Sequence, residues 1–503
     1  MADTRSDHKR IIVVGGGVSG MAAAYRVAEL AAARGTPIDV RVLEARDQLG
    51  GSLVTNRHDG FLVEAGPDSF ITQKPWALAL CKRLGLTDEI IPTNPAFRRT
   101  FVVRKGRLHP IPEGFLLLAP SRIMPFVTSR LFSWPGKLRM GLDLILPAKD
   151  HGHDGDESLA SFVRRRFGRE ALERVAQPLV GGIYTADPEM LGLRATMPRF
   201  LEMEAEHRSL ILGMRRAAKA MARASKQRNT AQSVDSGARY SMFVSLASGM
   251  SRLIEVLRSR LPADAIRTNA PVTRIAPVRN RWQVSLADGT GEIADGVILT
   301  CAAYHSAELV RTLDTSLADD LASIDYASSA TMSLAYRRED VPGPLDGFGF
   351  VVPFVENRTL IAVTFNSVKF AGRAPDGWVL MRAFLGGAMQ PEVYEMDDAR
   401  LRDAVLRDLR DLLGIEAPPR FVELYRWPRS MPQYPVGHLH AVAAIHRKLA
   451  SWPGLAIGGS AFGGVGIPDC VHSGETAAEA VVTHVAGVPD SNSAAWPGKS
   501  AAS

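Results

Sequence analysis

A glycine-rich loop near the start of the chain constrains the fold more than any other feature. Residues 11–14 are four β-branched residues, typical of a short buried parallel strand, and an alanine-rich helical run begins at Met21. The loop between them has the pattern G-x-G-x-x-G, in which a backbone turn and a helix N-terminus can face a diphosphate. We expect a dinucleotide-binding strand–loop–helix unit whose loop residues are Gly15, Gly17, Val18, Ser19 and Gly20.

An acidic residue follows the second predicted strand, residues 38–43. Glu44 stands directly after this strand and is followed by Ala45. A carboxylate at this position can accept hydrogen bonds from both hydroxyls of an adenosine ribose and would repel a 2′-phosphate. An ordinary surface glutamate is the alternative interpretation. The glycine loop before it favours the ribose contact.

Three further glycine segments favour FAD over NAD. Gly50 and Gly51 follow Glu44 after one short loop, and Gly66-Pro67 forms another turn. Near the end of the chain, residues 455–469 repeat the order of strand, glycine loop and helix, with Val465, Gly466 and Ile467 in the loop. A remote loop that returns to the N-terminal unit suits a ligand that extends past its adenosine to an isoalloxazine ring.

The length and composition indicate a multidomain globular protein. The chain has 503 residues, of which 46% are hydrophobic and 22% charged. The order of patterns predicts an α/β protein in which a Rossmann-type FAD-binding domain is interleaved with a mixed-sheet substrate domain and a mostly helical domain. The expected boundaries are 1–93, 240–302 and 430–486 for the FAD-binding domain, 94–110 and 303–429 for the substrate domain, 111–239 for the helical domain and 487–503 for a disordered tail.

The cysteine pattern and the hydropathy argue against several other classes. Cys81, Cys301 and Cys470 are far apart and odd in number, so neither a disulfide framework nor a metal site is expected, and a reducing cytoplasm fits. The N-terminus is charged with both signs and leads into the cofactor strand, unlike a signal peptide. No run reaches the ~18 apolar residues of a membrane span.

A basic run accounts for the whole net charge of +7. Residues 207–229 hold seven lysines and arginines and no acidic residue. They form either a solvated helix face or a surface that attracts a polycarboxylate or an anionic membrane. No nucleic-acid recognition motif accompanies them. Leucines and phenylalanines between about 111 and 225 are open to two interpretations, membrane contact or ordinary core packing.

No common catalytic motif is present: neither a nucleophile elbow, nor His-Glu-x-x-His, nor Cys-x-x-Cys. A flavin would therefore carry the chemistry, with the protein binding and orienting it.

Several motifs together resemble one family. Beside the glycine loops, the chain contains Glu-Ala-Gly-Pro-Asp-Ser-Phe at 64–70, Gly-Gly-Ile-Tyr-Thr-Ala-Asp-Pro at 181–188, Glu-His-Arg-Ser-Leu-Ile at 206–211, Asp-Gly-Phe-Gly-Phe-Val-Val-Pro at 346–353 and Arg-Trp-Pro-Arg-Ser-Met-Pro-Gln-Tyr at 426–434. With Gly-Val-Gly-Ile-Pro-Asp-Cys at 464–470 they resemble, in order and over residues 10 to about 485, the oxygen-dependent protoporphyrinogen/coproporphyrinogen III oxidases of haem biosynthesis.

The resemblance implies that a porphyrinogen is oxidised to a porphyrin by FAD and O2, with release of H2O2. The implied oxidation removes six electrons in three FAD cycles, by hydride loss from a meso carbon and proton loss from pyrrole N–H groups. A cytoplasmic protein, peripheral to the inner face of the cell membrane, is expected, with a homodimer and product transfer to a ferrochelatase as further implied partners.

The resemblance also assigns substrate residues. Arg99 matches a propionate-pairing arginine, since a guanidinium binds a carboxylate through two parallel hydrogen bonds. Val351 and Phe384 match apolar positions that enclose the macrocycle. A surface charge for Arg99 and plain core packing for the other two are the alternatives.

Flavin contacts are likewise implied at Val272, Trp427 and the loop Val465-Gly466-Ile467, beside Gly66, Pro67, Asp68 and Ser69. Asp68 could bind pyrrole N–H groups or accept a proton, as a catalytic residue. A routine turn-forming aspartate is the alternative.

The substrate stays open between coproporphyrinogen III, which the motif Gly-Pro-Asp-Ser-Phe and the basic run favour, and protoporphyrinogen IX. A flavin amine oxidase or desaturase and a flavin-free binder of the same architecture are more distant alternatives.

Overall fold

The computed structural model describes residues 9–97, 99–116, 119–120, 122–150, 152, 155–228 and 242–487. The side chains of 116, 119–120 and 221–228 are not described. The predicted tail, apart from Gly487, and the side chains of the last three basic residues of the basic run therefore lie outside the described part.

A five-stranded parallel sheet forms the base of the molecule. Its strands come from three distant stretches of the chain, and all neighbouring strands run parallel. The apolar run after Lys9 becomes its central strand because side chains on both of its faces are buried. The strand order is β12 (Ile266–Arg267), β2 (Ile38–Leu43), β1 (Lys9–Val14), β16 (Gly296–Leu299) and β22 (Leu455–Ile457).

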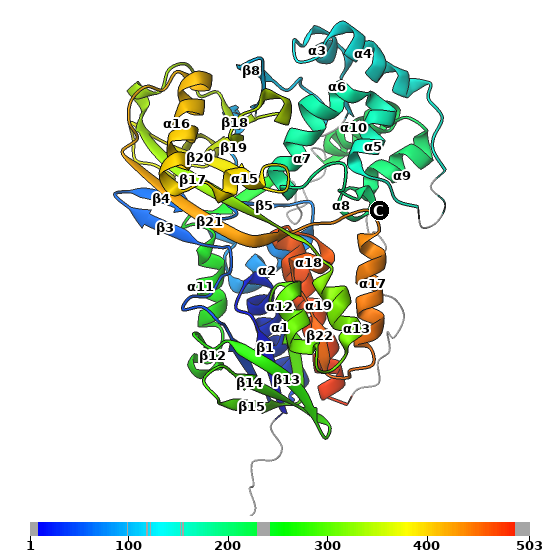
Figure 1. Cartoon of the computed structure of the whole chain (residues 1–503), viewed down its shortest axis with the longest axis vertical. Coiled ribbons are helices and arrows are strands. Elements are labelled where there is room, and N and C mark those ends of the chain that lie inside the picture. Colours follow the sequence, from blue (N-terminus) through cyan, green and yellow to red (C-terminus); the bar gives the residue numbers. More distant parts are fainter. Residues whose placement is uncertain are drawn as a thin grey trace, which may run out of the picture.

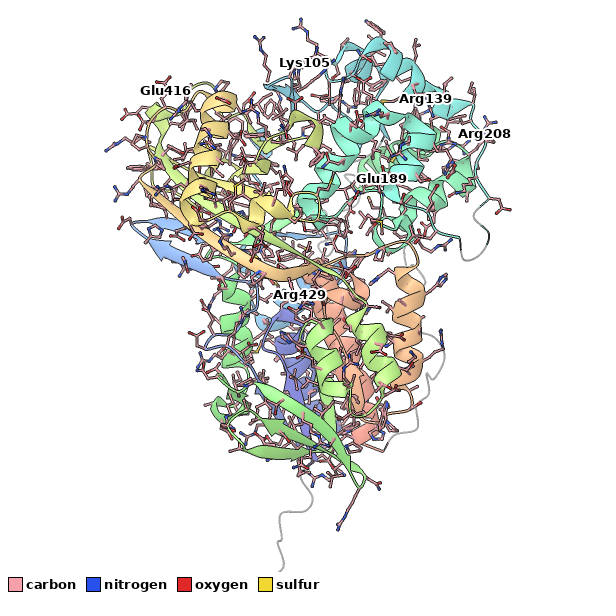
Figure 2. The ribbon with its side chains drawn as sticks, viewed as in Figure 1. Lys105, Arg139, Glu189, Arg208, Glu416 and Arg429 are labelled. Carbon is pink, nitrogen blue, oxygen red and sulfur yellow. The ribbon has the colours of Figure 1, made fainter. Side chains whose placement is uncertain are left out.

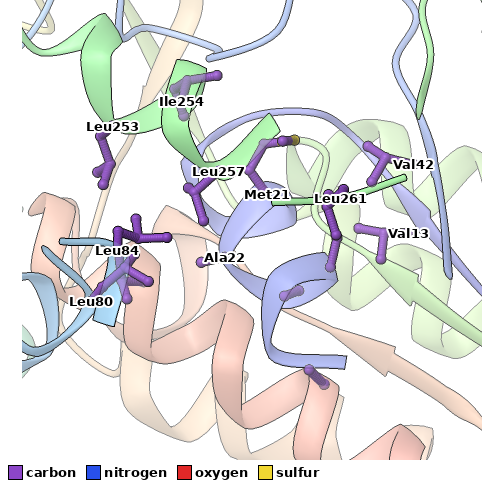
Figure 3. Packing of buried hydrophobic residues seen from close by; sticks show 14 of the residues in the cluster. Val13, Met21, Ala22, Val42, Leu80, Leu84, Leu253, Ile254, Leu257 and Leu261 are labelled. Carbon is purple, nitrogen blue, oxygen red and sulfur yellow. The ribbon is translucent and has the colours of Figure 1, made fainter. Parts of the chain in front are cut away.

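Helices cover both faces of this sheet. Ile11 and Val13 point to one face, whereas Ile12 and Val14 point to the other, as strand alternation requires. Figure 3 shows the first face, where Met21, Leu80 and Leu257 pack together. The helices on this face are α1 (Val18–Arg34), α2 (Pro75–Leu84), α11 (Ser251–Ser259) and α19 (Ile467–Val485), and those on the other are α12 (Ala303–Val310), α13 (Thr315–Ala322) and α17 (His438–Leu449).

A seven-stranded mixed sheet lies above this unit (Figure 1). Strands β18 and β7 pair in parallel, and the other neighbours are antiparallel. The helix α16 (Asp398–Leu413) packs on it through Leu401, Val405 and Leu409. The order is β21 (Phe421–Pro432), β17 (Tyr326–Arg337), β20 (Trp378–Gly386), β19 (Leu360–Phe365), β18 (Gly347–Val351), β7 (Arg99–Arg104) and β8 (Arg107–Pro110).

Smaller sheets connect these parts. They are β3 (Thr55–His58) with β4 (Phe61–Glu64), β5 (Phe70–Ile71) with β11 (Phe243–Leu246) and β6 (Ile90–Pro92), β13 (Val272–Val278) with β14 (Arg281–Leu286) and β15 (Gly291–Ala294), and β9 (Phe115–Leu116) with β10 (Ala119–Pro120). Strands β7 and β8 form a hairpin that turns at Lys105-Gly106, because they pair up to Arg104 and Arg107.

The third part is helical and lies beside the mixed sheet (Figure 1). Its phenylalanines, among them Phe126, Phe132, Phe162 and Phe167, are buried in one core. For these residues the core-packing alternative is therefore the correct one. The helices are α3 (Ile123–Thr128), α4 (Trp134–Gly141), α5 (Leu159–Phe167), α6 (Arg169–Ala171), α7 (Gln177–Tyr184), α8 (Leu193–Thr196), α9 (Pro198–His207) and α10 (Leu210–Arg228).

Within the described ranges, no helix combines the length and the apolar character needed to cross a bilayer. The architecture is thus the expected α/β one: a parallel sheet with helices on both faces, a mixed sheet and a helical part.

Candidate flavin and substrate site

The N-terminal glycine loop leads from β1 into α1 and carries Glu44 beside it. One carboxylate oxygen of Glu44 accepts a hydrogen bond from the Gly16 N–H at 2.6 Å, and the other accepts one from the Arg46 N–H at 2.9 Å. The side chain is 7% exposed at the end of β2. Each oxygen keeps further acceptor capacity, so the two ribose hydroxyls of an adenosine fit the carboxylate as it stands.

The space beside Gly17 fits a diphosphate. A Cβ added there would meet no protein atom closer than the Gly51 Cα, at 3.9 Å, and the φ of −70° suits any residue. The protein itself therefore does not require glycine at this position, whereas a ligand lying against the backbone would. Helix α1 has no side-chain cap and no acidic residue in its first turn, which leaves its N-terminal amides for an anion.

The second glycine pair is tied to the first loop. The Gly50 N–H donates to the Gly16 carbonyl at 2.8 Å, and Gly17 and Gly50 form an isolated parallel bridge. Gly51 lies against Gly17, since a Cβ at Gly51 would come within 3.3 Å of the Gly17 Cα. The two glycine segments therefore form one continuous wall.

The C-terminal glycine loop meets the same region. Helices α1 and α19 pack so closely that a Cβ at Gly474 would lie 2.1 Å from the Ser19 carbonyl oxygen. Val465 and Gly466 directly precede Ile467, the first residue of α19, and Gly466 is its N-cap. The structure thus brings together the N-terminal and C-terminal segments that the sequence predicts to bind one flavin.

The turn of residues 64–69, here called the flavin turn, is held by the mixed sheet. The Ala65 carbonyl accepts hydrogen bonds from the Thr331 hydroxyl at 2.6 Å and from the Trp427 indole N–H at 3.2 Å. Gly66 and Pro67 are half-buried and lie next to the buried Asp68. Trp427, on β21, is therefore placed beside the flavin turn.

Asp68 is a buried, ion-paired carboxylate. It accepts hydrogen bonds from the Lys369 ammonium at 3.0 and 3.1 Å and from the Ser69 hydroxyl at 2.7 Å, and the Arg382 guanidinium lies 3.4 Å away. Burial alone would raise the pKa of Asp68, but Lys369 and Arg382 outweigh it and hold this pKa well below its usual range. Such a carboxylate is a weak proton acceptor, so its geometry suits hydrogen bonding better than general-base catalysis. Its catalytic role stays a prediction.

Two of the predicted substrate residues lie in one apolar cluster with a predicted flavin contact. Val351 on β18, Phe384 on β20 and Val465 belong to the same hydrophobic cluster of the helical part. Phe384 is half-buried and pairs with Ala362 and Thr331 on the neighbouring strands. The Thr331 hydroxyl in turn binds the flavin turn, so Phe384 stands one strand from that contact.

Arg99 lies apart from these residues, at the first position of β7. Its side chain is 66% exposed and pairs with Asp346 at 2.9 Å. The ladder that starts at Arg99 and Gly347 ends at Val102 and Val351. Arg99 and Val351 therefore mark opposite ends of one strand pair.

Ala45 and Val272 belong to the far end of the predicted cofactor path. Ala45 is exposed directly after Glu44, and the Ala270 N–H donates to the Glu44 carbonyl at 2.8 Å. Val272, two residues further, is half-buried at the start of β13.

Sequence reasoning missed Lys369 and Arg382. Arg382 has a recognisable signal, because it is the single charged residue within the apolar strand of residues 378–386. A charge in a buried strand needs a partner. Lys369 lies in a short helical turn after β19 and has no comparable signal.

Comparison with known proteins gives consistent matches. The family described as flavin containing amine oxidoreductase matches residues 18–482. A coproporphyrinogen III oxidase of Bacillus subtilis (strain 168) is 34% identical over 95% of this chain and 98% of its own length. A protein of the same name from Propionibacterium freudenreichii subsp. freudenreichii is 37% identical over 97% of this chain and 94% of its own. A crystal structure from Exiguobacterium sp. 255-15 aligns with a TM-score of 0.81 at 30% identity, covering 94% of this chain and 98% of that one.

The family match, the relatives and the loop geometry agree on the cofactor. FAD fits the residues present: Glu44 would bind its ribose and the glycine wall its diphosphate, and the flavin turn is the predicted contact of its ring. The chain is an FAD-dependent oxidoreductase that belongs to the flavin-containing amine oxidoreductase family.

Proposed function

We propose that the protein oxidises coproporphyrinogen III to coproporphyrin III with O2 as acceptor and H2O2 as co-product. The observation that carries this proposal is the apolar cluster of Val351, Phe384 and Val465, which lies beside the flavin turn. An apolar macrocycle with carboxylates at its periphery suits such a cluster with a cation at its rim. Two relatives that cover nearly the whole chain bear the name of this activity.

The chain's own residues bind and orient in this reaction. Bound FAD supplies the redox chemistry, taking two electrons from the substrate for each O2 that is reduced to H2O2. Phe384 and Val351 enclose the macrocycle and exclude water from it. The carbonyl groups of the flavin turn are already occupied by Thr331, Trp427 and Arg382, which keeps this turn rigid.

Arg99 pairs with a substrate carboxylate at the rim in this proposal. Its guanidinium is mostly exposed, and only one of its terminal nitrogens is within hydrogen-bond distance of Asp346. The remaining donors are available to a propionate arriving from solvent. The basic residues Arg208, Arg215, Arg216 and Lys219 add to the attraction of a tetracarboxylate.

The experiment compares two substrates on the purified holoenzyme. Porphyrin fluorescence is followed after addition of coproporphyrinogen III or protoporphyrinogen IX, with O2 uptake and H2O2 measured in parallel. We expect a higher kcat/KM for coproporphyrinogen III. A higher value for protoporphyrinogen IX would assign the alternative substrate, and no porphyrin from either would refute the function.

A second proposal concerns a face of the helical part. We propose that this apolar face contacts an anionic membrane surface peripherally. It consists of side chains that are 42 to 72% exposed although they are large and hydrophobic: Ile123, Met124, Trp134, Leu138, Leu142 and Ile145. Arg122, Lys137 and Arg139 lie among them, and Figure 2 shows Lys105 and Arg139 at the same end of the molecule.

Vesicle sedimentation tests this face. The double variant L138D/I145D should bind vesicles containing anionic lipid several-fold less than the wild type. V278D replaces an equally apolar exposed residue on β13, far from the face, and should leave binding unchanged. Equal binding by all three proteins would refute the proposal.

We also propose that the chain has the three interleaved domains with the boundaries given above and that it forms a homodimer. We further propose that it lies at the inner face of the cell membrane and transfers its product to a ferrochelatase. The division into domains is supported by the parallel sheet, the mixed sheet and the helical part, each of which has its own hydrophobic core.

A further inference from the structure

Five charged residues lie together behind the flavin turn, and all of them except Lys369, whose side chain is 15% exposed, are buried. This buried charge cluster contains Glu64, Asp68, Lys369, Arg373 and Arg382. They come from two distant stretches of the chain: the flavin turn, and the segment that runs from the short helix after β19 through the following loop into β20. Charged groups in such an interior need mutual pairing, so the way each one is paired shows what the cluster is built to do.

Arg382 connects the flavin turn to the substrate-facing residue. Its Nη1 donates to the Glu64 carbonyl at 3.1 Å and to the Gly66 carbonyl, and its Nη2 lies 3.4 Å from Asp68. The same guanidinium lies over the Phe384 ring, 4.8 Å from its centroid. One side chain therefore contacts both the predicted flavin-binding backbone and the residue proposed to enclose the substrate.

The cluster carries an excess of positive charge. Lys369 and Arg382 both pair with the single carboxylate of Asp68. Arg373 is anchored through the Ser245 hydroxyl, which donates to the Asp68 carbonyl. Glu64 is the second carboxylate, and burial raises its pKa. Two carboxylates against three cations leave one positive charge in a buried site.

One donor of Arg382 has no partner. Among the residues that the structure describes, none accepts a hydrogen bond from its Nε, although the side chain is only 3% exposed. A buried N–H without an acceptor costs roughly 1–3 kcal/mol, so native structures rarely leave one without a ligand or water. A ligand that gains negative charge on reduction would balance the excess positive charge. If it also carries a hydrogen-bond acceptor, it would pair with the Nε donor.

We propose that Arg382 is a positioning residue that fixes the flavin turn and Phe384 together and, with Lys369, places a net positive charge behind the flavin ring that favours its reduced form. This inference rests on the proposed placement of the ring at the flavin turn. A flavin gains negative charge on reduction, and a fixed cation in a dry site stabilises that charge without reorganising.

The test measures the midpoint potential of the bound flavin by anaerobic equilibration with a redox dye, which requires no porphyrinogen. R382M and K369M each remove one cation. We expect each to weaken binding of reduced relative to oxidised FAD by about tenfold, which lowers a two-electron potential by about 30 mV. R169M removes an exposed, remote arginine and should leave the potential unchanged.

Two further variants separate charge from structure. D68N removes negative charge, so it should raise the potential. R382K keeps the charge but cannot reach both carbonyls, so the potential should stay near the wild-type value while the KM for porphyrinogen rises several-fold.

The inference is overturned if D68N lowers the potential as R382M does, or if neither R382M nor K369M moves it. If R382M does not fold with FAD bound, K369M and D68N decide by their opposite directions. The proposed activity is judged separately, by porphyrin formation in the wild type.

Discussion

Two buried arginines in this molecule have very different surroundings. Arg166, in the helical part, is fully buried, and all three of its guanidinium nitrogens donate to acceptors, including Asp143 and the Arg208 carbonyl. Its neighbours balance in charge, since Arg165, Arg166 and Lys149 face Asp143, Glu157 and Glu204. Arg382 has a nitrogen, Nε, that finds no acceptor in the part of the chain that the structure describes, and a surplus of positive charge surrounds it.

The contrast separates a structural ion pair from a site prepared for a ligand. Burying a charge costs free energy at both arginines. A purely structural role accounts for a buried arginine only when all of its donors are paired. Pairing is complete at Arg166. At Arg382 the Nε donor lacks an acceptor among the described residues, and our proposal assigns that role to the bound cofactor.

Replacing Arg166 should lower the free energy of unfolding strongly, because its pairing is complete. R166M leaves the Asp143 carboxylate buried without its cation, so we expect a loss of about 3–5 kcal/mol in the free energy of unfolding. Urea unfolding followed by circular dichroism measures this loss. R169M, at an exposed ion pair, should cost less than about 1 kcal/mol. A loss that small in R166M would contradict the structural role.

Phe384, whose ring lies under the Arg382 guanidinium, tests whether that arginine serves the substrate site. F384A should raise the KM for porphyrinogen roughly ten- to hundredfold, because a buried aromatic contact is worth about 1.5–3 kcal/mol. F384L keeps apolar bulk and should recover most of the affinity. Flavin content, read from the absorbance of the purified protein, should be unchanged in both. An unaltered KM in F384A would remove Phe384 from the substrate site.

Arg99 differs from these two arginines because its side chain is mostly exposed. R99A should raise the KM for porphyrinogen about tenfold, at the low end for a charged hydrogen bond because Arg99 is mostly solvent-accessible. Flavin content should not change. R311A, which also breaks an exposed ion pair, serves as the matched control. Equal KM values for R99A and R311A would show that Arg99 is a surface charge.

His438 is a buried imidazole that already has a hydrogen-bond partner, and it should affect only the pH dependence of stability. His438 lies 2.9 Å from the Ala461 carbonyl and stacks on Tyr434, and burial lowers its pKa to about 4. Below the unfolded pKa of about 6.5 only the unfolded chain binds the proton, so stability falls as the pH drops from about 6.5 towards 4.

H438Q should therefore lose less stability than the wild type between pH 7 and pH 6, by about 0.7 kcal/mol. Urea midpoints at the two pH values measure this difference. Parallel curves for the two proteins would mean that His438 is already protonated in the folded state.

The sequence predicts local features of this fold well and long-range charge pairing poorly. The strand at 11–14 and the helix after the first glycine loop are predicted by periodicity and glycine position, which act over a few residues. The glycine loops are recognisable because backbone approach to a ligand restricts the residue type.

The cluster around Asp68 is different, because Lys369 and Arg382 lie about 300 residues away in the chain. Nothing local indicates which lysine will reach that carboxylate. The same limit applies to the helical part, where hydropathy alone cannot distinguish buried Phe126 from exposed Met124 two positions earlier. Tertiary packing decides both.

The five-stranded sheet also constrains the order in which the protein can be assembled. Strand β22 and helix α19 come from the last tenth of the described chain, yet they pair with β16 and pack against α1. During translation the first glycine loop therefore lacks its C-terminal neighbour until the segment that forms β22 and α19 has left the ribosome. A flavin site that needs both loops is incomplete before that point, so chains truncated before residue 467 should be isolated without flavin.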